Sequence, residues 1–226
     1  MTGEQARDIS NKALKAAGVP EVEISLSHER HGFLRFARNA PTTSGLTLTG
    51  QANVTAWKGK RKASVAGAVD LANPKNAVEE LKRLVAQAER LAAISPEDRE
   101  YLPLLGPQKY LEVAAYDPDT AEMTATKRAQ HVADAIRVAN ERKVIVAGLF
   151  EQRGTEQSVA NSAGLFAYHR GSVATYSVTA RTPDDRGSGY TAVSSSRVGG
   201  LDFKETTGMA AHKAIESRNG KEIKPE

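Results

Sequence analysis

The sequence has 226 residues, with 31 Lys and Arg against 27 Asp and Glu, and therefore a formal net charge of +4. At ~150 residues per domain, that length allows one large domain or two small ones. A charged fraction of 26% with 18 Gly excludes a fibrous or fully disordered chain. The sequence has no Cys, which excludes a disulfide framework, a thiolate metal site and a cysteine nucleophile. Because neither a bilayer-spanning apolar run nor the apolar core of a signal peptide is present, we expect a soluble, cytoplasmic protein.

The first half of the sequence predicts a helix, an antiparallel meander and a second helix. Apolar residues three and four positions apart predict a helix over residues 4–17, which Gly18 and Pro20 end. Gly32 predicts a turn, and residues 41–45 predict a break between strands. Strands are expected at residues 22–26, 33–39 and 64–71, and residues 46–57 are expected to form one or two further strands. Asn73 and Pro74 then predict the start of a long amphipathic helix that ends at residues 95–96.

The same order of elements returns after residue 107. Residues 97–107 have the Pro and Gly content of a linker, and Asp117 predicts the cap of a helix that reaches residue 142. Its inward face is expected at Ala125, Ala129, Val132, Ile136 and Ala139. Further strands are expected at residues 144–150, 157–160, 165–169, 172–181 and 189–197, and a helix at residues 203–217.

This order predicts an α+β fold of two helix–antiparallel meander–helix units, divided as residues 1–106 and 107–226. It argues against the strict alternation of a parallel α/β sheet. The sequence ends at residues 223–226, just after a helix and where a further strand would be expected.

The five histidines do not make a recognisable metal site. His28 and His31 are three positions apart, whereas zinc proteases place two histidines four apart on a helix, with a glutamate as base. The run 28–31 also contains Arg30, so we expect a solvated hairpin turn. The remaining histidines, His131, His169 and His212, are expected at the surface.

No motif for nucleophilic catalysis or phosphate binding is complete. Ser188 lies between two glycines, but the flanking pattern and the following helix of a serine-hydrolase turn are missing. Neither Gly-rich phosphate-binding pattern occurs. Asp184 and Asp185 are adjacent acids, expected to be solvated in a loop. A self-sufficient hydrolase that uses Ser188 or His169 therefore has little support.

One dense basic cluster allows two interpretations. Lys58, Lys60, Arg61 and Lys62 surround Gly59. Such a cluster can contact phosphates, which makes a nucleic-acid-binding module the alternative function. It is also typical of a solvated hairpin tip, because Gly supplies the turn and lysines protect a strand edge. We favour the hairpin tip.

Two short motifs resemble those of a known family. Residues 34–39, Leu-Arg-Phe-Ala-Arg-Asn, resemble the "T-x-F/Y-A-N-N" strand of the TldD/PmbA family, the so-called modulators of DNA gyrase. Residues 161–165, Asn-Ser-Ala-Gly-Leu, resemble that family's "N-S-x-G-L" turn. The resemblance covers essentially the whole chain, in order. It departs from the family at Arg38, where the family usually has Asn.

The resemblance implies a peptide-processing metallopeptidase in which paired subunits enclose a cavity and cleave unfolded peptides. In TldD-type subunits the His-Glu-x-x-x-His metal motif lies in a carboxy-terminal half that this sequence lacks. We therefore expect the amino-terminal and central domains only, inactive alone, with no cofactor here and zinc only in a full-length TldD-type subunit.

The implied partners are an unfolded peptide and a TldD/PmbA-type subunit, in a homodimer or heterodimer. Neither a membrane nor nucleic acid is expected among them. The chain would supply scaffold, subunit contacts and cavity walls. Asn39, Asn161 and Gly164 are the candidate positions for a structural or peptide-contact role, and for both asparagines we favour turn chemistry as the explanation.

Overall fold

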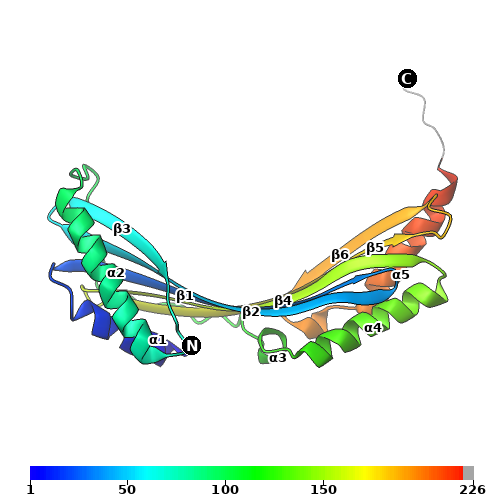
Figure 1. Cartoon of the computed structure of the whole chain (residues 1–226), viewed down its shortest axis with the longest axis horizontal. Coiled ribbons are helices and arrows are strands. Elements are labelled where there is room, and N and C mark those ends of the chain that lie inside the picture. The colour runs from blue at the N-terminus through cyan, green and yellow to red at the C-terminus, as the bar shows by residue number, and fades with distance from the viewer. Residues whose placement is uncertain (221–226) are drawn as a thin grey trace, which may run out of the picture. The chain divides into compact units, whose positions relative to one another are not determined.

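The computed structural model describes residues 1–220, which form helices and one six-stranded antiparallel sheet with strand order β3-β2-β1-β4-β5-β6 (Figure 1). The helices are α1 (Gly3–Leu14), α2 (Pro74–Ile94), α3 (Pro118–Ala121), α4 (Ala125–Glu141) and α5 (Phe203–Glu216), with 3₁₀ turns at Val198–Gly200 and Ser217–Asn219. The strands are β1 (Glu21–Ala37), β2 (Ala40–Lys58), β3 (Arg61–Ala68), β4 (Ile145–Asn161), β5 (Phe166–Arg181) and β6 (Ser188–Ser195). The α+β class is confirmed. Residues 223–226, near which a further strand was expected, lie outside the described part.

The chain divides into two compact units, each built from three segments. Unit 1 contains Met1–Glu29, Leu48–Ala114 and Thr155–Arg170. Unit 2 contains Arg30–Thr47, Ala115–Gly154 and the residues from Gly171 on. Strands β1, β2, β4 and β5 each supply residues to both units. The linear division at residue 106 stays a prediction.

In unit 1, the helices α1 and α2 pack together and cover one face of the strands (Figure 1). The apolar stripe of α2 meets the buried side chains of β1, of which Val22 and Ile24 are completely inaccessible. The predicted start of α2 is confirmed, because Asn73 caps the helix and Pro74 takes its first position. Because only one face of β1 is buried, apolar and polar residues alternate along it, and this alternation predicted a strand.

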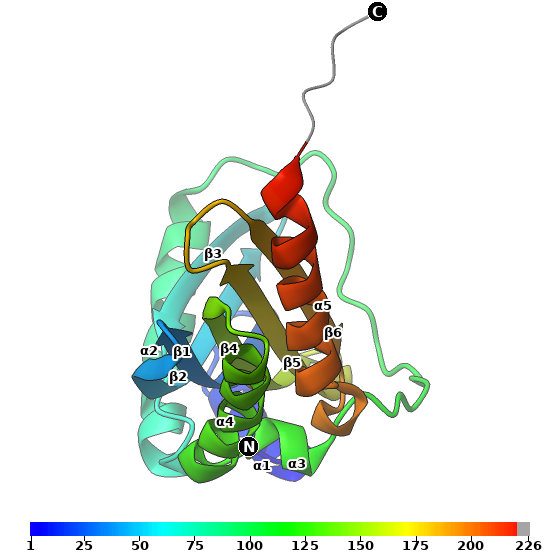
Figure 2. The same ribbon diagram turned by 90° about the vertical axis from the view of Figure 1, so that its right-hand side faces the viewer.

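In unit 2, α4 and α5 pack against each other and α5 lies along β6 (Figure 2). The core beneath them contains Phe36, Phe150, Tyr176 and Phe203. The Tyr176 ring is completely buried, and its hydroxyl pairs with that of Thr207 at 2.8 Å. Burial raises the pKa of Tyr176 to about 12, so this phenol stays neutral and serves as a core hydrogen-bonding group.

Several predicted breaks are wrong because the strands are longer than local sequence signals indicated. β1 continues through the predicted turn at Gly32, and β2 continues through residues 41–45. β4 joins residues 144–150 to 157–160, and β5 joins residues 165–169 to 172–181. Gly32 instead provides space, because a Cβ atom there would clash with the buried side chains of Arg128 and Gln152.

The predicted inward face of α4 is wrong at its amino end. Ala125 and Ala129 are exposed, and Arg128 is buried with 2% of its surface accessible. The Arg128 guanidinium reaches under the helix and donates to the carbonyl of Met123 at 3.1 Å. With its amide oriented to satisfy both neighbours, Gln152 accepts from Arg128 and donates to the Gly32 carbonyl, both at 3.0 Å. Hydrogen bonds to Met123 and Gln152 therefore allow a charged residue to occupy a buried position where the apolar pattern of the helix predicted alanines.

Replacing Gly32 with Ala should destabilise the protein by about 1–3 kcal/mol, because the new methyl group displaces buried polar side chains from their partners. Urea unfolding of Gly32→Ala measures the change. Gly199→Ala is the matched control, since a Cβ atom at Gly199 contacts nothing within 4 Å. Equal stability of wild type and Gly32→Ala would contradict the packing described for β1.

Candidate functional site

The first family-like motif ends in a tight hairpin of unit 2, and Asn39 ties this hairpin to the end of α4 and the start of β4. Arg38 and Asn39 both have left-handed backbones, with φ of 51° and 58°. The Asn39 amide donates to the Asn140 side chain at 2.8 Å and to the Val144 carbonyl at 2.9 Å. Its oxygen accepts from the backbone N–H of Val146 at 2.7 Å. Turn chemistry accounts for this asparagine, and a contact with peptide stays a prediction.

The second motif is a turn organised by one buried side chain. The oxygen of Asn161 accepts from the N–H groups of Ala163 and Leu165, both at 3.0 Å. Its amide donates to the carbonyl of Leu105 at 3.0 Å, which holds the loop after α2 against this turn. Gly164 has φ of 92°, a conformation that L side chains rarely adopt. Asn161 and Gly164 thus belong to one turn that the Asn161 side chain holds together, and a contact of either residue with peptide stays a prediction.

The basic cluster forms the β2–β3 hairpin tip, as predicted, with Gly59 in a left-handed conformation. Two of its four cations bind elsewhere in unit 1. Lys62 pairs with Asp98 at 2.6 Å, and Arg61 donates to the Ala93 carbonyl at 3.3 Å. The hydrogen bond from Lys62 holds the pKa of Asp98 below its ordinary value. The tip is therefore partly neutralised by the protein itself.

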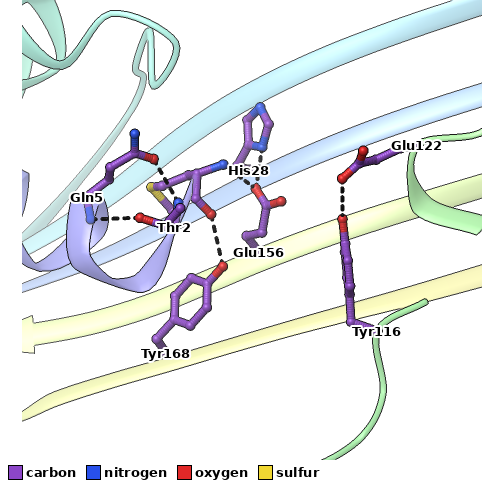
Figure 3. Close-up of polar contacts among 8 residues, drawn as sticks. Thr2, Gln5, His28, Tyr116, Glu122, Glu156 and Tyr168 are labelled. Carbon is purple, nitrogen blue, oxygen red and sulfur yellow. Dashed lines mark hydrogen bonds and ion pairs between the residues drawn. The ribbon is translucent and has the colours of Figure 1, made fainter. Parts of the chain in front are cut away.

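His28 lies within β1, and the predicted solvated turn at residues 28–31 is wrong. Its Nδ1 pairs with Glu156 at 2.6 Å, and the same carboxylate pairs with the Met1 ammonium group at 3.0 Å (Figure 3). The Tyr168 hydroxyl donates to the Met1 carbonyl at 2.9 Å (Figure 3). Burial opposes ionisation of Glu156, but hydrogen bonds from His28 and the ammonium group outweigh it and lower the pKa of Glu156. This cluster fastens the start of α1 to β4 and β5.

Figure 3 also shows two local contacts. Thr2 and Gln5 form a reciprocal capping box at the start of α1. In unit 2, the Tyr116 hydroxyl donates to Glu122 at 3.0 Å.

His31 and His131 are both engaged in unit 2. His31 pairs with Glu151 at 2.8 Å. His131 is half-buried and stacks on Phe203 with ring centroids 4.6 Å apart, so the prediction of a surface position for His131 is wrong. Burial, and next the charge of Lys127, lower the pKa of His131, which therefore stays neutral near pH 7. His169 and His212 are exposed, as predicted.

The remaining candidates are also explained by local structure. Ser188 begins β6, so it does not occupy a strand-to-helix turn. Asp184 pairs with Arg218, and Asp185 pairs with Arg181 at 2.9 Å, so these acids are not simply solvated. The hydrogen bond from Thr182, with the Arg218 contact, lowers the pKa of Asp184 to about 2. Within residues 1–220, no three His, Asp or Glu side chains gather as a metal site would require.

Replacing Asn161 with Ala should cost about 2–4 kcal/mol, because the buried N–H of Leu165 and the carbonyl of Leu105 lose their shared partner. Thermal unfolding measures the loss. Ser162→Gly is unsuitable as a control variant, because it would remove the hydrogen bonds of the Ser162 hydroxyl to Val22 and Pro20. Ala163→Gly changes an exposed side chain in the same turn and should cost much less. A similar loss in both variants would contradict the role assigned to the Asn161 side chain.

The stability lost on replacing Glu156 with Gln should depend on pH. Because the folded-state pKa lies below the ordinary value of 4.5, the ionised carboxylate stabilises the fold above pH 4.5. That contribution is lost as the pH falls through the folded-state pKa. We expect a deficit of about 1–2 kcal/mol for Glu156→Gln at pH 7 that narrows below pH 4.5. A deficit that stays constant to pH 3, measured by urea unfolding, would contradict this assignment.

Comparison with known proteins gives a family match for the segment that contains the second motif. Residues 110–218 match the family described as PmbA/TldA metallopeptidase central domain. No curated protein matches the sequence. Among residues 1–220, no helix is long and apolar enough to cross a membrane.

Solved structures share the fold at low sequence identity. A modulator of a DNA gyrase from Thermotoga maritima has a TM-score of 0.80 and 18% identity, over 97% of this chain and 50% of that chain. TldE from Thermococcus kodakarensis has a TM-score of 0.77 and 19% identity, over 93% of this chain and 47% of that one. A modulator of DNA gyrase from Bacteroides thetaiotaomicron has a TM-score of 0.70 and 14% identity, over 97% and 51%.

The chain thus spans about half the length of the solved structures that it matches. The family match covers both the second motif and the helices of unit 2. The match of residues 110–218 places this segment of the chain in the TldD/PmbA family, as its metallopeptidase central domain.

Proposed function

We propose that this chain is the amino-terminal part of a TldD/PmbA-type peptide-processing metallopeptidase or of its non-catalytic partner subunit, acting in the cytoplasm. In this role it supplies scaffold, subunit contacts and walls of a peptide cavity. The observation that carries the proposal is the match of residues 110–218 to the metallopeptidase central domain. The fold shared with TldE from Thermococcus kodakarensis supports it.

An open strand edge in unit 2 supports a role in polypeptide contacts. β3 pairs with β2 only from Gln51 to Lys58, so residues 40–47 of β2 lack a neighbour on that side within the described sheet. This stretch carries no charged side chain, and Leu46 is 47% exposed. Natural sheets usually protect such edges with charges, because an unpaired edge accepts another extended chain. An uncharged edge therefore suits a partner strand or a peptide.

The zinc that the family implies does not fit the residues described here. A catalytic zinc needs three protein ligands, and no group of three His, Asp or Glu side chains forms within residues 1–220. The sequence supplies no Cys either. In the proposed role, residues 1–220 therefore do not hold the catalytic zinc.

No specific observation favours the alternative of a nucleic-acid-binding module. All four cations of the tip are exposed, but Lys62 pairs with Asp98 and Arg61 donates to the Ala93 carbonyl. The two remaining lysines, Lys58 and Lys60, provide a weak electrostatic footprint.

A reconstitution experiment tests the proposal. The purified chain alone should not hydrolyse fluorescently labelled denatured casein. It should bind a TldD-type subunit from the same source, and chelator-sensitive hydrolysis should appear only when that subunit is present. Chelator-sensitive hydrolysis by the chain alone would contradict the scaffold role, and the absence of any association would contradict the subunit role.

The double variant Thr43→Lys/Thr47→Lys should weaken that association at least tenfold, because charge and bulk on the open edge oppose strand pairing. Ala147→Lys is the matched control, since Ala147 is exposed in unit 2 but lies on β4, which has a neighbour on each side. Equal weakening by the double variant and the control, measured by analytical ultracentrifugation, would rule out the edge as the contact.

A further inference from the structure

Unit 1 contains a pocket on the face of its sheet opposite α1 and α2. The pocket has a volume of about 450 Å³, and Glu23, Trp57 and Val159 from three strands form its floor. The loop after α2 forms its wall with Leu104, Leu105 and Tyr110, and the lining is completed by Pro103, Leu165 and Ala167. All of these residues belong to unit 1. The lining is mostly apolar and aromatic, with one carboxylate.

The loop that forms the wall is held in place by specific bonds. Glu21 accepts a hydrogen bond from the Tyr101 hydroxyl at 2.7 Å and one from the Leu104 N–H at 3.4 Å. Asn161 holds the Leu105 carbonyl at 3.0 Å. These bonds fix residues 101–105 of the loop against the strands. The part of the wall formed by Leu104 and Leu105 is therefore in place before any ligand arrives.

Glu23 differs from its neighbour Glu21 because its carboxylate has no partner. Among residues 1–220, Glu23 takes part in no side-chain hydrogen bond or ion pair, although it is half-buried. Burial alone raises the pKa of Glu23 above its ordinary value. Removing a carboxylate from water without a partner costs stability, and a bound cation would remove that cost.

The aromatic and apolar groups around Glu23 are also suited to a cation with an aliphatic stem. A guanidinium or ammonium group is attracted to the face of Trp and Tyr rings, and the stems of Arg and Lys cover apolar surface. Leu105 is 66% exposed and Tyr110 is 53% exposed, so both have surface free to cover such a stem. The neighbouring Leu111 is 94% exposed and offers further apolar surface.

We propose that the pocket formed by Glu23, Trp57 and Tyr110 binds an arginine or lysine side chain of an extended, otherwise apolar peptide. The carboxylate of Glu23 pairs with the cationic head, and the rings and leucines contact the stem. An anion is disfavoured because the only charged group in the lining is negative. A hard metal ion is disfavoured because it needs several oxygen ligands, and both oxygens of Glu21 are already engaged.

Trp57 is the only tryptophan in the chain, so its fluorescence reports on this pocket directly. The probes are the peptides acetyl-Ala-Leu-Arg-Leu-Ala-amide and acetyl-Ala-Leu-Lys-Leu-Ala-amide. A third peptide replaces arginine with citrulline, which keeps the shape of the side chain but removes its charge. We expect a saturable change in Trp57 emission with the two cationic peptides and binding at least tenfold weaker with the citrulline peptide. Equal binding of all three, or no saturable change with any, would overturn the proposal.

Glu23→Gln should weaken binding of the arginine peptide about tenfold, to the level of the citrulline peptide. The variant should keep its fold, because it removes an unpaired charge, and thermal unfolding checks this. Glu141→Gln is the charge-matched control, since Glu141 is exposed at the end of α4 in unit 2. Unchanged affinity in Glu23→Gln would overturn the proposal, as would an equal loss in Glu141→Gln. If Glu23→Gln unfolds, the comparison of arginine with citrulline on the wild-type protein decides alone.

The experiment needs neither a partner subunit nor hydrolysis. Its failure is therefore distinguishable from failure of the proposed function, and the two proposals stand separately.

Discussion

The structure depends on long strands that are buried on one face only. β1 and β4 run without interruption over Glu21–Ala37 and Ile145–Asn161, and in each unit a pair of helices covers one face of the strands. Side chains alternate between the faces, so every second residue of these strands enters a core. The intervening residues remain available for polar contacts and for a pocket. The core and the candidate binding groups thus follow from the same alternation.

This arrangement places the two family-like motifs at turns between long strands. Asn39, in the turn between β1 and β2, bonds to the backbone of Val144 and Val146, whereas Asn161 bonds to N–H groups within the turn between β4 and β5. Each asparagine thus provides partners to backbone groups at an end of the strands. Residues at these turns keep long strands in register, which a scaffold for larger assemblies requires.

Helices and their caps could be predicted from the sequence because their signals are local. Asn73 and Pro74 act within a few residues of their own positions and begin α2 as expected. The prediction for Asp117 is wrong in part, because Asp117 caps the short helix α3 and Thr124 caps the long helix α4. Gly32 could not be interpreted locally, since its role depends on Arg128 and Gln152, which are remote in sequence. Arg128 itself replaces the apolar residue expected inside α4, because carbonyl and amide groups of unit 2 compensate its burial.

The unpaired carboxylate in unit 1 could not be predicted either. Alternation in β1 placed Glu23 on a polar face, and Glu21 two residues earlier has the same pattern. What separates them is the loop after α2, which supplies partners to Glu21 and apolar walls to Glu23. Sequence periodicity describes which face a residue occupies, but it does not describe what a distant loop places over that face.

Hydrogen–deuterium exchange along β1 tests the central claim most directly. If the strand is continuous, amides on both sides of Gly32 should be protected by sheet hydrogen bonds and should exchange slowly, together with the rest of β1. Rapid exchange confined to residues 29–33, as in a solvated hairpin turn, would contradict the account.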